Sequence, residues 1–134
     1  MVQQRPDPGH PETTRGTGHS IEIEPAAERI VISFNGETVA DSKRALMLTE
    51  TGYPPVAYLP LDDVREGVLS PSEHSTHCPF KGDARYYHLS AGGKTAENAV
   101  WGYPDPLGAV AEIERFVAFY VGKVEGLEQR RERA

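Results

Sequence analysis

The run that decides the fold class is Arg29-Ile30-Val31-Ile32-Ser33-Phe34-Asn35-Gly36-Glu37-Thr38-Val39-Ala40-Asp41. Asn-Gly between two β-rich stretches is the strongest short signal for a β-hairpin, because both residues accept the positive φ angles of a type I′ turn. A two-residue loop pairs Ile32 with Val39 and Phe34 with Glu37. Ile30, Ile32 and Val39 then share one face, so the sequence predicts an antiparallel pair of strands with a buried side.

Short apolar runs around this hairpin predict further strands. Residues 21–24 alternate and stop at a proline, which is typical of an edge strand. Residues 45–48 are expected to form a third strand, since their helical alternative is short, and residues 56–59 a fourth with prolines outside both ends. Residues 62–64 predict a single helical turn, and residues 66–73 a loop.

A second hairpin is predicted around Ala91-Gly92-Gly93. If all three residues form the loop, Tyr86 faces Asn98 and Asp83 lies opposite Trp101. If Gly92-Gly93 alone forms the turn, the register slips by one residue and the faces exchange. In either register, the second strand is expected to return beside residues 81–83.

One helix is predicted near the C-terminal end of the domain. Asp105-Pro106 supplies an N-cap acceptor followed by proline at the first helical position. Leu107 and Val110 continue a helical spacing, which predicts a helix from Pro106 to about Arg115. Residues 116–120 are aromatic and β-branched, and they favour an extended segment.

Composition divides the 134 residues into three parts. Residues 1–18 are rich in Pro, Gly, Thr and Gln, and we expect a disordered arm because they hold too few apolar side chains to offset the entropy of ordering. Residues 19–125 are expected to form one domain. Residues 126–134 are expected to be a charged tail that frays from Leu127.

The charge and cysteine content exclude some classes of function. The net charge is −6, with 20 acidic residues against 14 basic ones, which argues against sequence-independent nucleic-acid binding. The single cysteine excludes an intrachain disulfide framework, so a cytoplasmic location is expected. The sequence shows no signal-peptide pattern and no run of about 20 apolar residues, so we expect a soluble protein without a membrane partner. The oligomeric state stays open.

The densest group of reactive side chains is Thr76-His77-Cys78-Pro79-Phe80-Lys81-Gly82-Asp83-Ala84-Arg85-Tyr86-Tyr87, at the predicted corner where a loop becomes a strand. Cys78 is a candidate nucleophile, since a nearby cation such as Lys81 lowers the pKa of a thiol. The alternative is a small buried hydrophobe. Lys81 and Gly82 are suited to holding an anion, unless Lys81 and Asp83 neutralise each other in a turn.

Two further arrangements are weaker. His74, His77, Cys78 and His88 contain metal-ligating atoms, but zinc sites usually show a second tight pair of ligands, so no metal is predicted. Four aromatic residues, Tyr86, Tyr87, Trp101 and Tyr103, are candidates for the wall of a pocket for a planar ligand. Tyr86 and Tyr87 are consecutive and cannot share a face of a strand, so one is expected in the core.

These motifs identify a resemblance that spans about residues 19–124. The sequence resembles the bacterial family catalogued as domain of unknown function 427, which also carries a nucleotidyltransferase-type label. The motifs that carry the resemblance are Asn35-Gly36-Glu37, Val39-Ala40-Asp41-Ser42, Arg44-Ala45-Leu46, Tyr53-Pro54-Pro55-Val56, Thr76 to Ala84 with Tyr86-Tyr87, Asn98-Ala99-Val100-Trp101 with Tyr103 and Asp105-Pro106, and Ala118-Phe119-Tyr120.

The resemblance implies a mainly β (α+β) fold, a small curved antiparallel arrangement, tent-like or barrel-like, with one or two short helices. It implies no settled activity. Nucleotidyltransferases need a Gly-Ser turn and spaced metal-binding carboxylates, whereas Asp62-Asp63 is adjacent, so we do not adopt that label. In this sequence Leu61 replaces the family's usual arginine, which removes an anion contact, and Val121-Gly122 stands where Pro-Asp is common.

The leading hypothesis places a small-molecule site, for an anionic or nucleotide-like ligand, between residues 78–83 and residues 101–105. Lys81 binds an anionic group, Asp83 orients it or acts as a base, and Cys78 lies beneath; all three are candidates for catalysis. The ligand is enclosed by the side chains of Tyr86, Trp101 and Tyr103. The alternative is a non-catalytic protein-interaction module whose motifs are structural. No cofactor is predicted.

Overall fold

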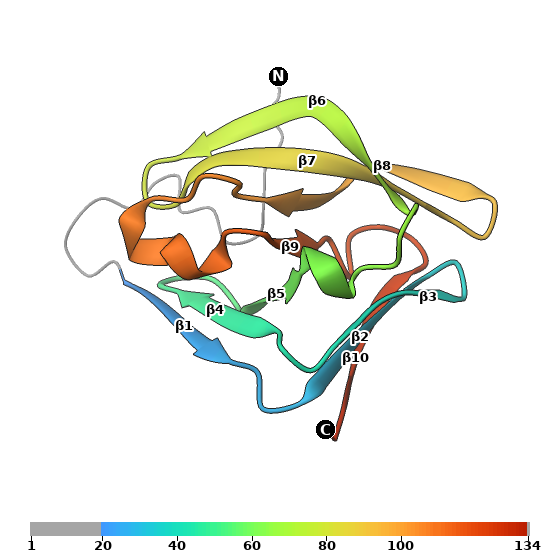
Figure 1. Cartoon of the computed structure of the whole chain (residues 1–134), viewed down its shortest axis with the longest axis horizontal. Coiled ribbons are helices and arrows are strands. Elements are labelled where there is room, and N and C mark those ends of the chain that lie inside the picture. Colours follow the sequence, from blue (N-terminus) through green and yellow to red (C-terminus); the bar gives the residue numbers. More distant parts are fainter. Residues whose placement is uncertain (1–19, 134) are drawn as a thin grey trace.

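The computed structural model describes residues 20–133, which form two antiparallel sheets (Figure 1). The strands are β1 (Ile21–Pro25), β2 (Arg29–Phe34), β3 (Glu37–Ser42), β4 (Leu46–Glu50), β5 (Val56–Pro60), β6 (Leu69–Cys78), β7 (Gly82–Ala91), β8 (Lys94–Gly102), β9 (Phe116–Phe119) and β10 (Leu127–Glu132). Two short 3-10 helices, η1 (Leu61–Asp63) and η2 (Gly108–Ile113), complete the described elements.

The larger sheet has the strand order β1-β4-β5-β9-β8-β7-β6, and the smaller sheet has the order β10-β2-β3. Figure 1 shows the larger sheet curving from β6 at the top of the view to β1 at the lower left. The prediction of a mainly β fold with curved antiparallel strands is confirmed. Within residues 20–133 neither sheet closes, so the barrel-like alternative is not found.

The Asn35-Gly36 hairpin forms as predicted. Both turn residues have positive φ angles, 53° and 83°, and Phe34 pairs with Glu37. The predicted Ile32–Val39 pair is wrong, because a bulge between Ile32 and Ser33 shifts the register and Ile32 pairs with Ala40. A bulge places one extra residue on one strand, and both Val39 and Ala40 are consequently buried.

The second hairpin begins in one of the two registers that the sequence left as alternatives, and then departs from both. Gly92-Gly93 form the turn, and Ala91 pairs with Lys94. An irregularity between Tyr87 and Leu89 then shifts the pairing, and Asn98 has a positive φ of 54°. Tyr86 therefore lies opposite Trp101, not Asn98, and the expected position of Asp83 opposite Trp101 is wrong.

Two segments predicted to be irregular are strands. The sequence predicts a loop over residues 66–73, but β6 begins at Leu69 and pairs with β7 along the edge of the larger sheet. The tail expected to fray from Leu127 forms β10, which pairs with β2 and places Leu127 opposite Phe34. Both segments are polar, and pairing with a distant strand determines their conformation. The arm predicted over residues 1–18 lies outside the described residues.

The remaining predicted elements are largely present. Residues 21–24, 45–48, 56–59 and 116–120 correspond to β1, β4, β5 and β9, and the turn at residues 62–64 corresponds to η1. The helix predicted from Pro106 is the shorter η2, interrupted at Val110, which has a φ of −126° and a ψ of 28°. Val110 and Ile113 are buried, so the apolar spacing identified the buried side correctly.

Side chains pack into two cores on opposite faces of the larger sheet. On β7, Leu89 belongs to the first core and Tyr86 to the second. Likewise, Val117 and Phe119 of β9 contribute to the first core and Ala118 to the second. This alternation follows from the two-residue period of a strand, and it decides on which face each candidate functional side chain lies.

Candidate functional site

The predicted ligand-binding lysine is enclosed in the protein. Lys81 is 0% exposed, and its Nζ donates a hydrogen bond to Oε1 of Glu50, at the end of β4, over 2.6 Å. Nζ also lies 5.9 Å from the centre of the Tyr103 ring. Burial of an ammonium group is tolerated where a carboxylate balances it. The geometry therefore gives Lys81 a structural partner and no access to a ligand from solvent.

Cys78 is enclosed beside this pair. It is 1% exposed and belongs to the second core. Burial raises the pKa of the Cys78 thiol, and the charge of Lys81 offsets only part of that rise. The sequence correctly identified Lys81 as a cation that favours the thiolate, but desolvation is the larger effect. The protonated thiol is a poor nucleophile.

Asp83 lies on the other face of β7. It is exposed, and its Oδ1 is 2.7 Å from Nδ1 of His77 on β6. Asp83 shares this face with Arg85 and Tyr87, whereas Ala84 lies on the opposite face in the second core. The structure therefore does not bring Lys81 and Asp83 together, because Lys81 precedes the strand and turns inward.

The predicted aromatic wall is mostly core. Trp101 is 0% exposed, and its Nε1 donates to the Tyr58 hydroxyl over 3.2 Å. The Tyr86 hydroxyl is 3.0 Å from Oγ1 of Thr76. Tyr86 is buried and Tyr87 is half-buried, as expected for consecutive residues of a strand. Tyr103 is buried as well, but it also borders a cleft.

The histidines have separate surroundings. The ring centres of His74 and Tyr86 are 4.5 Å apart, and Nδ1 of His88 accepts a hydrogen bond from the backbone N–H of Asn98 over 3.2 Å. Among residues 20–133, no three His, Cys, Asp or Glu side chains gather in a way that could hold a metal ion.

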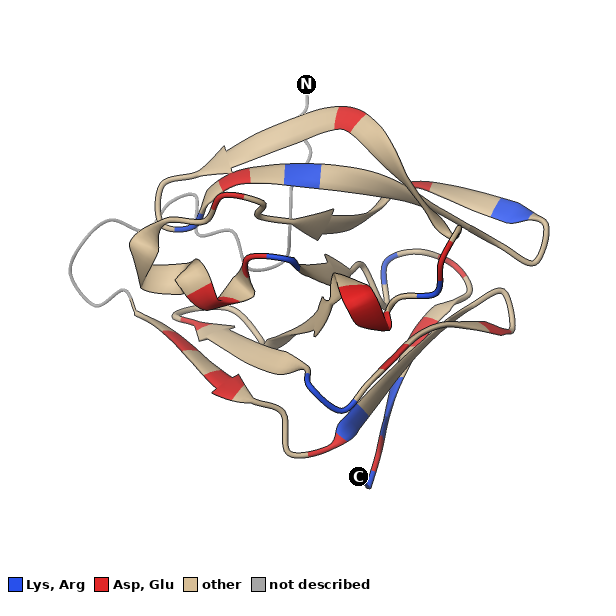
Figure 2. Cartoon of the chain, viewed as in Figure 1, with Lys and Arg blue, Asp and Glu red and all other residues tan. Residues whose placement is uncertain are grey.

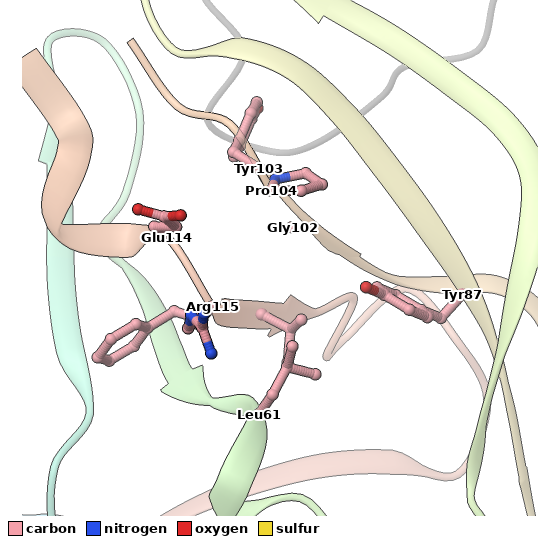
Figure 3. Close-up of a pocket in the computed structure, with 9 residues that line it drawn as sticks. Leu61, Tyr87, Gly102, Tyr103, Pro104, Glu114 and Arg115 are labelled. Carbon is pink, nitrogen blue, oxygen red and sulfur yellow. The ribbon is translucent and has the colours of Figure 1, made fainter. Parts of the chain in front are cut away.

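An open cleft of about 210 Å³ lies on the face of the larger sheet that carries Tyr87 (Figure 3). Four parts of the chain form it: the start of η1, the middle of β7, the segment that leaves β8, and the segment that enters β9. Its lining residues are Leu61, Tyr87, Gly102, Tyr103, Pro104, Glu114, Arg115, Phe116 and Val117.

The floor of this cleft is formed at a row of residues that pair across neighbouring strands. Arg85 pairs with Gly102, Gly102 with Val117, and Val117 with Leu59, so the row crosses four strands. Gly102 adds no side chain to the row. A Cβ atom there would lie 2.9 Å from the carbonyl oxygen of Phe116 and 3.2 Å from Cγ1 of Val117. Only glycine allows this close approach of β8 to β9.

Arg115 provides the cation of the cleft. Its backbone has a φ of 70°, in the left-handed region, and its carbonyl oxygen accepts a hydrogen bond from the N–H of Leu61 over 2.9 Å. The side chain is exposed, and no ion pair or hydrogen bond engages the guanidinium within the described part of the chain. Figure 3 shows the guanidinium beside Leu61, within the group of lining side chains. A left-handed φ in a non-glycine residue is often found at functional sites.

Other polar groups surround this guanidinium. Figure 3 shows the Tyr87 hydroxyl directed toward the middle of the cleft and the Glu114 carboxylate on the opposite side. A second cleft of about 340 Å³ shares Leu61, Glu114, Arg115 and Phe116 with the first and adds Arg44, Pro60 and Asp62. Arg115 therefore faces an extended depression at the junction of the two clefts.

Arg44, the other arginine of this region, is already engaged. Its Nη2 is 2.8 Å from Oδ1 of Asp63, and its Nε donates to Oδ2 over 3.3 Å. The Ser42 hydroxyl donates to the same Oδ2 over 2.6 Å. These contacts with Arg44, and with Ser42 to a smaller degree, lower the pKa of Asp63, while burial opposes them. Arg44 and Asp63 thus satisfy each other.

Little in the sequence indicates the Arg115 cleft. Leu61, at which the resemblance implies an arginine, lines both clefts, and this departure is a signal that the sequence offers. The helical spacing predicts that Arg115 is near the end of a helix. Its left-handed backbone and its position beside Gly102 depend on the pairing of β5, β8 and β9, which no local pattern reveals.

A family model described as Domain of unknown function (DUF427) matches residues 22–130. The match includes the buried Lys81–Glu50 pair and every residue that lines the Arg115 cleft. No curated protein matches the chain. Within residues 20–133, no helix has the length and apolar character needed to cross a membrane.

Proposed function

The chain belongs to the DUF427 family, and we propose that it binds a small anionic molecule in the Arg115 cleft. The sequence indicated an anionic ligand near residues 101–105, and Gly102, Tyr103 and Pro104 border this cleft. The proposal keeps that class of ligand and assigns its recognition to Arg115, because Lys81 is buried against Glu50.

The observation that carries this proposal is the unpaired guanidinium of Arg115 inside a concave site. Arg29, Arg44, Arg65 and Arg130 each form an ion pair with a carboxylate. Arg115 has exposed donors and no such partner within residues 20–133. A guanidinium presents a planar set of donors that matches a carboxylate or a phosphate.

The remaining lining residues match a ligand with an apolar body. Leu61 is one of the exposed large hydrophobic side chains, at 36% exposure, and Phe116 and Pro104 add further apolar surface. The Tyr87 hydroxyl offers an additional donor. The first cleft is smaller than the roughly 300–1,000 Å³ of typical ligand pockets, so it accommodates a small ligand or one part of a ligand that extends into the second cleft.

The proposal is tested by titrating ¹⁵N-labelled protein with sodium benzoate and with phenyl phosphate, and following the amide signals of Leu61, Gly102 and Arg115. We expect saturable shifts at these residues in the unaltered protein. Arg115→Gln is expected to weaken the binding of each probe by at least about tenfold, as expected when a charge-assisted contact is lost.

Arg133→Gln is the matched control, because Arg133 is exposed and lies beyond β10. It makes the same chemical change and is expected to leave the binding constants unaltered. Absence of saturable shifts with both probes at millimolar concentration would contradict the proposal. Equal losses in the two variants would show that net charge is responsible, and would contradict it as well.

A further inference from the structure

A second arginine lies on the same face of the sheet as the Arg115 cleft. Arg85 is on β7, two residues before Tyr87, which lines the cleft, so both side chains project from one face. Arg85 pairs directly with Gly102, the floor of the cleft. Because Gly102 has no side chain, nothing from β8 separates Arg85 from the side chains of β9.

The geometry of the sheet allows Arg85 and Arg115 to contact one ligand. Gly102 lies between Arg85 on one side and Val117 on the other, and Arg115 precedes Val117 by two residues. Two strand spacings separate β7 from β9 by about 10 Å, and the two-residue offset of Arg115 adds about 7 Å along the strand. Both distances are within the combined reach of two arginine side chains. An anion above Gly102 lies between the two guanidinium groups.

Arg85 has no competing partner. It is exposed, and within residues 20–133 no carboxylate or carbonyl oxygen engages its guanidinium. The nearest carboxylate on its own strand is Asp83, which is 2.7 Å from His77. Figure 2 shows acidic and basic residues interspersed over the strands. Arg85 and Arg115 are both exposed, and they lie on strands or segments that meet at Gly102.

Building on the proposed function, we infer that the anionic group of the ligand is a phosphate monoester, held above Gly102 between Arg115 and Arg85. A phosphate monoester carries a charge of about −1.5 to −2 at neutral pH and three acceptor oxygens. Two arginines therefore match it better than a carboxylate, which one guanidinium satisfies. The Tyr87 hydroxyl supplies a further donor, and the ester group lies against Leu61 and Phe116.

The experiment compares phenyl phosphate, benzoate and inorganic phosphate at about pH 7.5, where the monoester is mainly a dianion. Binding constants come from NMR titrations of the unaltered protein and of Arg85→Gln, Arg85→Lys and Arg133→Gln. Phenyl phosphate and benzoate share the aromatic ring and differ in the anionic group. Inorganic phosphate lacks the ring and measures the contribution of the apolar walls.

We expect phenyl phosphate to bind about tenfold more tightly than benzoate, and inorganic phosphate to bind more weakly than phenyl phosphate. Arg85→Gln is expected to remove most of the preference for phenyl phosphate and to leave benzoate within about twofold. Arg85→Lys is expected to restore part of the affinity for phenyl phosphate, because it restores the charge. Arg133→Gln is expected to change none of these constants.

The outcomes separate this inference from the proposed function. If benzoate binds as tightly as phenyl phosphate, or if Arg85→Gln does not alter phenyl phosphate binding, the inference is wrong and the Arg115 site stands as a carboxylate site. If inorganic phosphate binds as tightly as phenyl phosphate, the monoester class is wrong. If no probe binds, both the inference and the proposed function fail.

Discussion

Two cations, Lys81 and Arg115, lie near the Gly102–Tyr103 segment and differ in exposure and in ion pairing. Lys81 is 0% exposed, pairs with Glu50 at 2.6 Å and lies over the ring of Tyr103. Arg115 is exposed beside Gly102 and has no ion-pair partner among the described residues. Lys81, which lies in the dense polar motif, is inaccessible to solvent. Arg115, which lies in no recognisable motif, is accessible to a ligand.

This difference shows that the polar residues of a dense motif, here residues 76–87, can stabilise the fold and need not bind a ligand. A buried ion pair contributes little net stability compared with an apolar pair, but removing one partner leaves an uncompensated charge. The Cys78–Lys81 turn therefore depends on Glu50 of β4, a strand far away in the sequence. Substitutions in the two regions are expected to have opposite consequences, with large effects on stability at Lys81 and on binding at Arg115.

The largest effect is expected from Lys81→Met. It leaves the Glu50 carboxylate buried without its cation, and breaking a buried pair in this way typically costs about 3–5 kcal/mol. Urea unfolding at neutral pH measures the loss. The double variant Lys81→Met with Glu50→Leu is the control, and it should recover most of the stability because neither charge remains. A loss below about 1 kcal/mol for Lys81→Met would show that this pair is not a fixed part of the fold.

Gly102→Ala tests the boundary between the two regions. The new Cβ would lie 2.9 Å from the carbonyl oxygen of Phe116, and such overpacking typically costs about 1–3 kcal/mol. The same methyl group fills the floor of the cleft, so binding of phenyl phosphate should also weaken. Gly108→Ala is the matched control, since a Cβ at Gly108 meets nothing within 4 Å. Unchanged stability in Gly102→Ala would contradict the described approach of β8 to β9.

Asp63→Asn tests the ion pair between Asp63 and Arg44, the arginine that lines the second cleft. The folded-state pKa of Asp63 is lowered, chiefly by Arg44, so its stabilisation is present above the unfolded pKa of about 3.9 and is lost as the pH falls through the folded value. We expect a loss of up to about 1 kcal/mol at neutral pH, and a progressively smaller loss as the pH falls below the unfolded pKa of about 3.9.

Unfolding of the unaltered protein and of Asp63→Asn across this range of pH measures that difference. Asp62→Asn is the control, because Asp62 is an exposed neighbour on η1. A difference between the unaltered protein and Asp63→Asn that does not shrink on acidification would show that the carboxylate of Asp63 is not selectively stabilised in the folded state.

The smallest effect on stability is expected from Arg115→Gln. The guanidinium makes no described contact that the fold requires, so the free energy of unfolding should change by less than about 0.5 kcal/mol. The carbonyl contact from Arg115 to Leu61 is made by the backbone and persists in the variant. Thermal unfolding measures the change. A loss as large as that of Lys81→Met would mean that the two cations do not differ as described.

Local sequence predicted the elements well where particular residue types favour one backbone conformation or one buried side. Asn35-Gly36 determined a hairpin, prolines bounded short strands, and the spacing of Val110 and Ile113 identified a buried side. Prediction failed where pairing with a distant strand overrides local polarity, as in β6 and β10. It also failed in register, because the bulges near Ile32 and Asn98 shift pairs without a distinct sequence signature.

For the candidate site, the sequence by itself determined the class of fold, the family and the chemistry of the side chains in residues 76–87. Tertiary structure alone decided which of them face solvent. Lys81 turns inward because Glu50 lies there to neutralise it, and Asp83 faces outward because a strand alternates its side chains. Arg115 becomes a candidate because β5, β8 and β9 meet around Gly102, and that meeting depends on long-range pairing that no short stretch of sequence encodes.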